Sequence, residues 1–424
     1  MSFIIAIVVG SVLLLLPVST YNGISYIDAL FTSTSAICVT GLTVLDTGKD
    51  FTFFGKTVIL ILIQLGGLGI MTFSVLFLIF LKNKMPWNAK IAIKSTYSEK
   101  YFDLKLLIKN IVIATVVIEL TGAFLLFVYF YFHDLKFGNA VFVSIFHSVS
   151  AFCNAGFSVF SNSLIDFQGN WYINIIIMCL IIAGGIGFTV YLDIRQKSLS
   201  LHSKIVLTVS GLLILTGTVA IFFSEYSNAF AGTDFSNKLL VSLFQSVTAR
   251  TAGFNTIDLN KFKDFSLIVI MLLMFIGASP GSCGGGVKTT TFTVFWLTLF
   301  ATARGRDYIN IFNRTITKEI IFKSFAIMLI SITALLLGIL ALAYFDPTPM
   351  NRLDFLSSTF EAFSALGTVG LSIGYTHKLT LGGKIVIIIL MYIGRVGPLT
   401  LILGLRYRSR KHMIQYAEEN VMLG

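Results

Sequence analysis

The sequence predicts an all-α polytopic membrane protein in which four pseudo-repeats surround one central pore. The first observation is composition: of 424 residues, 56% are hydrophobic and 12% are charged, with a mean hydropathy of +0.87. Soluble domains carry roughly 25% charged residues, so an ordinary soluble fold is excluded. The second observation is a stretch of ten or eleven residues that occurs four times.

The four copies begin with Phe, continue with small and hydroxyl residues, and end with Gly followed by Leu or Phe. They lie at 31–41, 146–156, 244–253 and 360–370, and the third is one residue shorter than the others. The closing glycines are roughly a hundred residues apart, which indicates one structural repeat each. A helix of about eleven residues covers only half of a ~30 Å hydrocarbon core. Each copy is therefore predicted to enter the membrane and turn back, which requires burial in protein or a watery cavity.

Each repeat is predicted to contain an outer helix, a re-entrant pore helix with a filter strand, and an inner helix. In chain order we expect helices at about 3–16, 28–38 and 55–81; 106–132, 139–151 and 171–193; 203–223, 238–249 and a span from Asp264; and 318–345, 351–366 and 382–405. The units are repeat one at 1–81, a basic cytoplasmic link at 82–105, repeat two at 106–193, repeat three at 203–302, repeat four at 318–405 and a cytoplasmic tail at 406–424.

The basic residues are distributed unevenly between the two predicted faces. Of 31 Lys and Arg residues, 19 fall in segments that would face one side and nine in segments that would face the other. By the positive-inside rule the richer side is cytoplasmic, and eight spans then place both termini there. The net charge of +11 thus reflects basic residues on the predicted cytoplasmic face and does not indicate nucleic-acid binding. A multi-pass protein of the cell membrane is expected.

The strands that close the four stretches are the predicted cation site. Their backbone carbonyls can form rings, with one carbonyl from each repeat, that replace the water around an ion. The pore helices direct their partially negative C-terminal ends at the same place. The residues are Val39, Thr40, Gly41, Asn154, Ala155, Gly156, Thr251, Ala252, Gly253, Thr368, Val369 and Gly370. No acidic ring is apparent in these stretches, so size and carbonyl field are expected to set selectivity. Close helix contacts or ordinary turns are the alternative.

The inner helix of repeat three is predicted to break, because it contains Pro280 and several glycines that no helix tolerates. The residues of this predicted gate are Gly277, Ser279, Pro280, Gly281, Ser282, Gly284, Gly285, Gly286 and Lys288, with Arg395 as a contact from repeat four. An arginine is costly in lipid, so Arg395 is expected to face the pore, to contact the broken segment and to hold a closed state. A structural bridge between helices is the alternative for Arg395. Lys288 follows a near match to a phosphate-binding loop and is expected at the cytoplasmic end of the break.

Other ionisable residues are weaker candidates. Glu119 is expected to bond to a neighbouring helix, with a role in ion passage as the alternative, and Arg250 to turn away from the pore and brace the pore helix. A membrane-embedded enzyme is the alternative from another class of protein. The five histidines and four cysteines are scattered, however, so neither an enzyme nor a structural metal site is favoured. Cys38 and Cys153 occupy equivalent repeat positions, but isolated thiols are favoured over a disulfide.

The chain resembles the ion-translocating subunits of the Ktr/Trk/HKT superfamily of K+ transporters, and most closely the bacterial KtrB type. The resemblance covers essentially the whole chain. It is carried by the four repeated stretches together with 66–69 (GGLG), 184–188 (GGIGF) and 394–398 (GRVGP).

The resemblance implies channel-like K+ uptake, an intramembrane gating loop, a homodimer in membrane lipid and a cytosolic nucleotide-binding ring of the RCK type. It implies no cofactor on this chain. In that family the position of Gly41 is glycine in K+-selective members, and Na+ is a possible co-ion or modulator. A Na+-coupled carrier of K+ is the alternative, although four repeats in one orientation favour a central pore.

Overall fold

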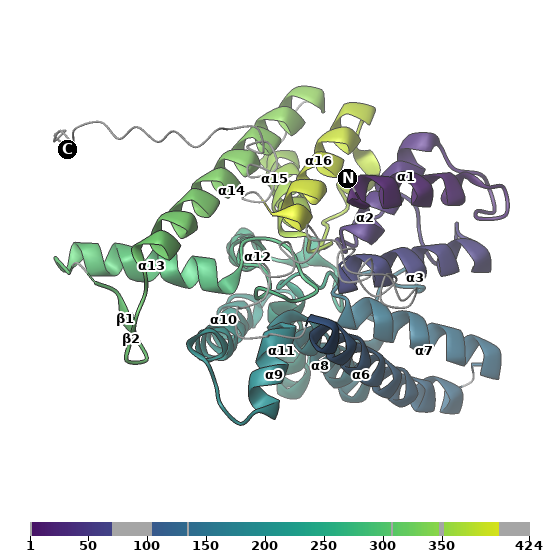
Figure 1. The fold of residues 1–424 in the computed structure, drawn as a ribbon. Coiled ribbons are helices and arrows are strands. Elements are labelled where there is room, and N and C mark those ends of the chain that lie inside the picture. Colours follow the sequence, from purple (N-terminus) through teal and green to yellow (C-terminus); the bar gives the residue numbers. More distant parts are fainter. Residues whose placement is uncertain (1, 70–103, 134, 307, 347–351, 398–424) are drawn as a thin grey trace.

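The structure is a computed structural model that describes residues 2–69, 104–133, 135–306, 308–346 and 352–397. It is almost entirely helical (Figure 1). Nearly all of the predicted basic link at 82–105, the predicted tail at 406–424, and the ends of two predicted inner helices at 70–81 and 398–405 lie outside the described residues.

The helices follow the predicted order in each repeat. Repeat one contains α1 (Ser2–Leu15), α2 (Tyr26–Ile37) and α3 (Phe53–Leu68); repeat two contains α6 (Leu104–Phe132), α7 (Phe137–Phe152), α8 (Trp171–Ile186) and α9 (Phe188–Arg195). Repeat three contains α10 (Leu201–Glu225), α11 (Phe235–Thr248), α12 (Asp264–Phe275) and α13 (Thr289–Ala303); repeat four contains α14 (Lys318–Phe345), α15 (Arg352–Gly367) and α16 (Leu381–Val396). Short 3-10 helices lie at η1 (Ile165–Phe167), η2 (Leu259–Lys261) and η3 (Thr376–Lys378).

A small antiparallel hairpin, β1 (Asn310–Ile311) and β2 (Arg314–Thr315), connects α13 to α14. It pairs Asn310 with Thr315 and Ile311 with Arg314. The sequence analysis did not predict this hairpin, because two-residue strands leave no detectable alternation of polar and apolar residues.

Local sequence explains where several helices begin. Ser25, Thr52, Asn170, Ser200 and Thr380 each precede a helix and accept a hydrogen bond from a backbone N–H in its first turn. A side-chain oxygen at this position satisfies one of the amides that the helix leaves without a partner. The caps fix the first residue of a pore helix, an outer helix and three inner helices.

Three inner helices end earlier than predicted. The expected helices at 55–81, 171–193 and 382–405 are interrupted at Gly69, Gly187 and Gly397, whose φ angles are 77°, 97° and 84°. Only glycine adopts a positive φ at little cost, so each of these residues stops a helix inside an apolar run. In repeat two the chain continues as α9, which meets α8 at 91°. Hydropathy is the same for a straight and a bent helix, which is why the sequence analysis missed these breaks.

Within the described ranges, three helices are long and apolar enough to cross a membrane, at 109–132, 201–225 and 318–345. The pair α8 and α9 makes a fourth if it is counted as one span. The remaining apolar helices have 10–17 residues, because the breaks and the re-entrant turns shorten them. The topology of eight spans therefore stays a prediction, and helix length by itself does not test it.

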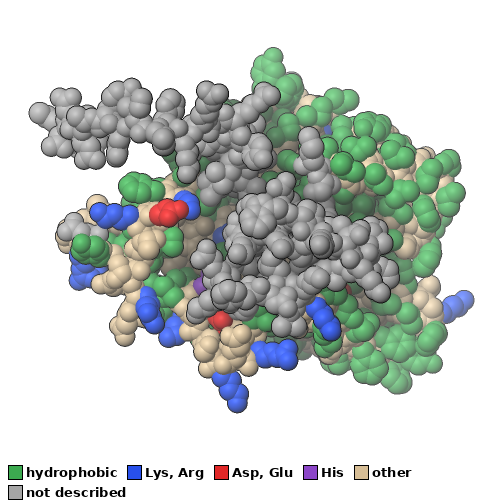
Figure 2. All heavy atoms as spheres, viewed as in Figure 1, with side chains coloured by type: hydrophobic (Ala, Val, Ile, Leu, Met, Phe, Trp, Pro, Cys, Tyr) green, Lys and Arg blue, Asp and Glu red, His purple; other side chains and the backbone are tan. Residues whose placement is uncertain are grey.

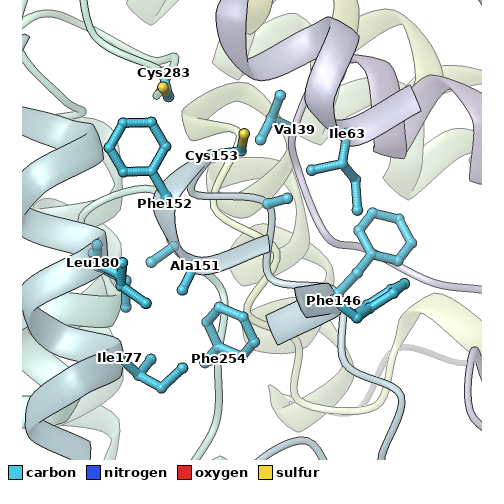
Figure 3. Close-up of a cluster of buried hydrophobic side chains, with 14 of the residues drawn as sticks. Val39, Ile63, Phe146, Ala151, Phe152, Cys153, Ile177, Leu180, Phe254 and Cys283 are labelled. Atoms are coloured by element: carbon cyan, nitrogen blue, oxygen red, sulfur yellow. The ribbon is translucent and has the colours of Figure 1, made fainter. Parts of the chain in front are cut away.

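The hydrophobic core joins successive repeats. One cluster of buried side chains links repeats one, two and three, a second links three and four, and a third links four and one. Figure 3 shows part of the first cluster, in which Val39 of repeat one, Phe146 and Phe152 of repeat two and Phe254 of repeat three lie together. The phenylalanines that open the four repeated stretches, Phe31, Phe146, Phe244 and Phe360, are all fully buried. These anchors place the four pore helices at the centre of the molecule.

An ion pair joins the first repeat to the last. The Nζ atom of Lys384 on α16 donates to Oδ1 of Asp28 on α2 at 2.6 Å, and the two side chains are 15% and 17% exposed. Ser25 also donates to the Asp28 carboxylate, at 2.7 Å. Removing one partner of a partly buried ion pair destabilises the folded protein, because the charge of the other partner stays desolvated.

Replacing Asp28 with Asn should lower the free energy of unfolding by about 1–3 kcal/mol, since Lys384 would then lack a carboxylate partner. Thermal unfolding of the purified protein in detergent measures the change. The double variant Asp28→Asn with Lys384→Met should recover part of the loss. Lys49→Met is the control, because that side chain is 74% exposed and lies 4.0 Å from its partner Asp46. A loss no greater than that of the control would show that the Asp28 pair contributes nothing.

Candidate functional site

The four filter strands, residues 39–41, 154–156, 251–253 and 368–370, share one unusual backbone conformation. The first residue of each has a positive φ: Val39 56°, Asn154 59°, Thr251 67° and Thr368 48°. The closing glycines also have positive φ angles: Gly41 90°, Gly156 70°, Gly253 80° and Gly370 92°. L-residues rarely adopt this conformation, and strain of this kind concentrates at functional sites. Its presence at the same position of all four stretches indicates a shared role.

The four glycines lie next to one another in a closed order. A Cβ atom added to any of them would stand within 3.0 Å of the carbonyl oxygen that precedes the glycine of the next repeat. The oxygens are those of Ala155 facing Gly41, Ala252 facing Gly156, Val369 facing Gly253 and Thr40 facing Gly370. The fourth contact returns to the first repeat, so the strands surround a common point. No residue larger than glycine fits at these positions without moving the backbone.

Hydroxyl side chains hold the filter strands against the pore helices. The residue four positions after each opening Phe is Ser or Thr in all four stretches. Ser35 and Ser364 each accept from the N–H of the closing glycine at 3.0 Å. Ser150 and Thr248 instead donate to the carbonyls of Phe157 and Phe254, at 2.7 and 2.8 Å. The hydroxyl residues in the repeated stretches therefore satisfy backbone groups of strands that have no sheet partner.

All four filter glycines line one cavity of about 470 Å³, which we call the vestibule. Two acidic residues, Asp46 and Asp258, line it together with Asn255 and His377. Low-dielectric walls with acidic side chains raise the local concentration of cations. The sequence analysis missed Asp46 and Asp258 because they lie in loops after the strands, outside the repeated stretches. Carboxylates a few residues beyond two of the closing glycines were the signal that could have revealed them.

The glycine-rich loop, residues 276–288, lies directly against the other side of the filter strands. Its two ends are held together, since the N–H of Gly277 donates to the carbonyl of Val287 at 2.8 Å. At its middle, the N–H of Gly285 donates to Oγ1 of Thr368 at 3.1 Å. A Cβ atom on Gly284 would stand within 3.0 Å of Oγ1 of Thr251. The predicted break in this inner helix is present, and the loop covers two of the four strands.

Inner helices of two other repeats hold the loop through backbone hydrogen bonds. Ser279 and Cys283 donate to the carbonyls of Gly185 and Gly184 of repeat two, both at 3.1 Å. Gly286 donates to the carbonyl of Gly394 of repeat four at 3.3 Å. These acceptors are available because the helices break just beyond them, at Gly187 and Gly397, and leave their last carbonyls without intrahelical partners. The N–H groups of the loop thus find acceptors in the carbonyls that the helix breaks leave free.

Arg395 connects the loop to a third inner helix. Its guanidinium donates to the carbonyl of Cys283 in the loop and to the carbonyl of Gly66 on α3. The predicted contact with the loop is therefore present, and so is the bridge between helices that was its alternative. Lys288 bonds within the loop, where its Nζ atom donates to the carbonyl of Gly284 at 2.6 Å.

Of the other ionisable candidates, Arg250 turns away from the strands, whereas the Glu119 carboxylate accepts from the thiol of Cys153, just before the second strand. Arg250 donates to the carbonyl and hydroxyl of Ser210, at 3.5 and 3.2 Å, so it ties the end of α11 to the outer helix α10. Glu119 accepts from Nε2 of Gln64 at 3.2 Å, which is the predicted bond to a neighbouring helix. The four cysteines are free. Among the described residues, no group of His, Cys, Asp and Glu side chains is arranged to hold a metal ion.

Comparison with known proteins gives consistent matches over the whole chain. The family model described as "TrkH: Cation transport protein" matches residues 2–413. The chain is 40% identical to the Ktr system potassium uptake protein B of Bacillus subtilis, covering 100% of this chain and 95% of that protein. It is 39% identical to the potassium/sodium uptake protein NtpJ of Enterococcus hirae, with the same coverage.

A solved structure supports the fold. The crystal structure of the potassium transporter TrkH from Vibrio parahaemolyticus matches with a TM-score of 0.72 at 21% identity, covering 95% of this chain and 82% of that one. At this identity the likeness concerns the fold alone. Together with the family match over nearly every residue, these results show that the chain belongs to the TrkH family of cation transport proteins.

Proposed function

We propose that this protein carries out channel-like K+ uptake across the cell membrane through a selectivity filter of backbone carbonyls. The observation that carries the proposal is the closed order of the four glycines, each facing a carbonyl oxygen of the next repeat. The names of its relatives, which refer to potassium uptake, support K+ as the ion. Membership of a family of transport proteins agrees with the prediction that the chain is not an enzyme.

The proposed filter works by exchanging water for peptide oxygens. A K+ ion that enters the vestibule loses its hydration shell and is coordinated by carbonyls of residues 39–41, 154–156, 251–253 and 368–370. The pore helices α2, α7, α11 and α15 end immediately before these strands, so their partially negative C-termini stabilise a cation at the centre. The resemblance associates glycine at the position of Gly41 with K+ selectivity, and all four closing positions of this chain are glycine.

The proposed gate is the glycine-rich loop. The loop lies against Thr251 and Thr368, on the side of the strands opposite the vestibule, so an ion leaving the filter would meet it. Arg395 stabilises this closed arrangement through its bond to Cys283. The loop is held by several hydrogen bonds, each contributing about 0.5–1.5 kcal/mol, and by the burial of Ile276, Cys283 and Val287, so its displacement must overcome both.

Coupled transport of Na+ with K+ is the second candidate, favoured by the name of the Enterococcus relative. Flux measurements separate the two. A passive pore lets K+ equilibrate with the membrane potential, whereas a coupled carrier accumulates K+ only while a Na+ gradient is present. Na+ as a modulator would change the rate of K+ uptake without changing its equilibrium.

Regulation is proposed to come from a separate chain, a nucleotide-binding ring of the RCK type that docks on the basic cytoplasmic face of a homodimer. Both termini are predicted to lie on that face. The relatives that are named as proteins of the Ktr system support a partner. No cofactor on this chain is needed for the proposed mechanism.

Replacing Gly41 with Ser should reduce the preference for K+ over Na+, because a side chain there would displace the carbonyl of Ala155. Uptake by cells that lack their own K+ systems measures the preference. Gly23→Ser is the matched control, since Gly23 has a similar φ of 77° but no neighbour within 4 Å of its Cβ position. An unchanged ion preference in a well-expressed Gly41 variant would count against the filter.

Replacing residues 279–286 by a short linker should raise K+ flux in the absence of any partner, since the strands would lose their cover. Arg395→Met should raise it less, because the backbone bonds to Gly184, Gly185 and Gly394 would remain. Ion preference serves as the internal control and should not change in either variant. Flux that stays the same or disappears in a folded protein would mean that the loop is not the gate.

Replacing Asp46 and Asp258 with Asn should raise the KM for K+ roughly threefold at low ionic strength, because the vestibule would attract fewer cations. Added salt should shrink the effect, since it screens the carboxylates. Asp166→Asn is the control: Asp166 is exposed in η1 and does not line the vestibule. An effect that does not depend on salt would exclude electrostatic attraction as the cause.

A further inference from the structure

We propose that the corner formed by the C-terminal half of α13, the β1–β2 hairpin and the first turns of α14 binds the headgroups of anionic lipids. We call this region the basic corner. It projects from the body of the molecule, and the hairpin lies at the far end of α13 (Figure 1). It takes no part in the filter, the vestibule or the glycine-rich loop.

Among the described residues, most cations of the basic corner form no ion pair with a carboxylate. Between 304 and 323 the sequence has five basic and two acidic residues. Lys323 is paired with Glu319 at 2.5 Å. The other four basic side chains are exposed, and within the described ranges no carboxylate forms an ion pair with them: Arg304, Arg306, Arg314 and Lys318. Figure 2 shows Lys and Arg atoms gathered over α13 and the hairpin.

The position of α14 places the basic corner at the membrane surface. Helix α14 has 28 residues and an apolar window of mean hydropathy 2.7. At 1.5 Å per residue it is longer than the ~30 Å hydrocarbon core, so its first turns reach the headgroup region. The hairpin and the end of α13 directly precede those turns. Their cations are therefore at the depth where lipid phosphates lie.

Exposed aromatic side chains surround these cations. Trp296 and Phe300 on α13 are 42% and 57% exposed, Tyr308 before the hairpin is 67% exposed, and Phe322 on α14 is 75% exposed. Aromatic rings mixed with Lys and Arg are typical of membrane interfaces, where the rings contact acyl chains and the cations contact headgroups. Protein interfaces are also rich in aromatic residues, so the depth set by the first turns of α14 is what favours a lipid here.

The basic corner is also preformed. A separate hydrophobic cluster, Val294, Ile309 and Ile316, packs the hairpin between α13 and α14. The rings of Phe295 and Phe325 lie 4.8 Å apart across the two helices. The cations therefore lie on a rigid scaffold. The protein loses little conformational entropy when a lipid binds there.

Lipid binding at this corner would affect the glycine-rich loop, a consequence that rests on the proposed gate. Helix α13 begins at Thr289, one residue after the loop ends. Anchoring its far end to the membrane limits how far the exit of the loop can move. Binding itself does not depend on the proposed function and is tested separately.

The test uses the full chain reconstituted in vesicles with Trp296 as the only tryptophan, after Trp87→Phe and Trp171→Phe. Lipids with brominated acyl chains quench a tryptophan that they contact. Brominated phosphatidylglycerol should quench Trp296 at a lower mole fraction than brominated phosphatidylcholine does. Replacing Arg304, Arg306, Arg314 and Lys318 with Gln should reduce this preference by up to roughly 600-fold, since each contributes about a factor of five near an anionic surface and the four factors multiply.

The matched control removes four exposed cations from the predicted opposite face, with Lys136, Lys261, Lys263 and Lys378 each replaced by Gln, and should leave the preference unchanged. If both lipids quench Trp296 equally in the protein that keeps all four cations, the proposal is overturned. The proposal is also overturned if the four-Gln variant keeps its preference for phosphatidylglycerol. This holds whether or not that variant loses binding to a cytosolic protein. Quenching by phosphatidylcholine reports that each variant remains inserted and folded.

Discussion

Four backbone segments meet so closely that only glycine fits between them, and the rest of this structure depends on that contact. Gly41, Gly156, Gly253 and Gly370 each face a carbonyl of the following repeat. Backbone groups at membrane depth need partners, because lipid supplies none. The strands obtain theirs from the hydroxyls of the pore helices, such as Ser35 and Ser364, which bond the glycine amides. The polar residues of the repeated stretches are therefore required by the strands themselves.

The same constraint explains the inner helices. Each break frees carbonyls that must be satisfied, and the glycine-rich loop supplies several of the donors: Ser279 and Cys283 bond repeat two, and Gly286 bonds repeat four. Arg395 adds a charged donor that reaches Cys283 and Gly66. The loop therefore supplies hydrogen-bond partners to the helices around it and is itself held in place by them.

Much of the fold could be predicted from the sequence, because the pattern occurs four times, and the four predicted strands do lie next to one another. A single stretch such as 31–41 indicates little, whereas four copies between apolar segments indicate homologous units around one axis. The helix at 318–345 was predicted to the residue, since its apolar run has a clear start and end. The vestibule acids Asp46 and Asp258 were missed, because they belong to loops that differ between repeats.

The sequence by itself determined the membrane environment, the repeats and the glycine positions, because hydropathy and periodicity are local properties of the chain. Only the tertiary structure decided that the inner helices end at Gly69, Gly187 and Gly397, and that Arg395 reaches both the loop and repeat one. A glycine in an apolar run is compatible with a straight or a broken helix. The choice between them depends on whether neighbouring repeats offer partners to the freed carbonyls, and those partners are distant in sequence.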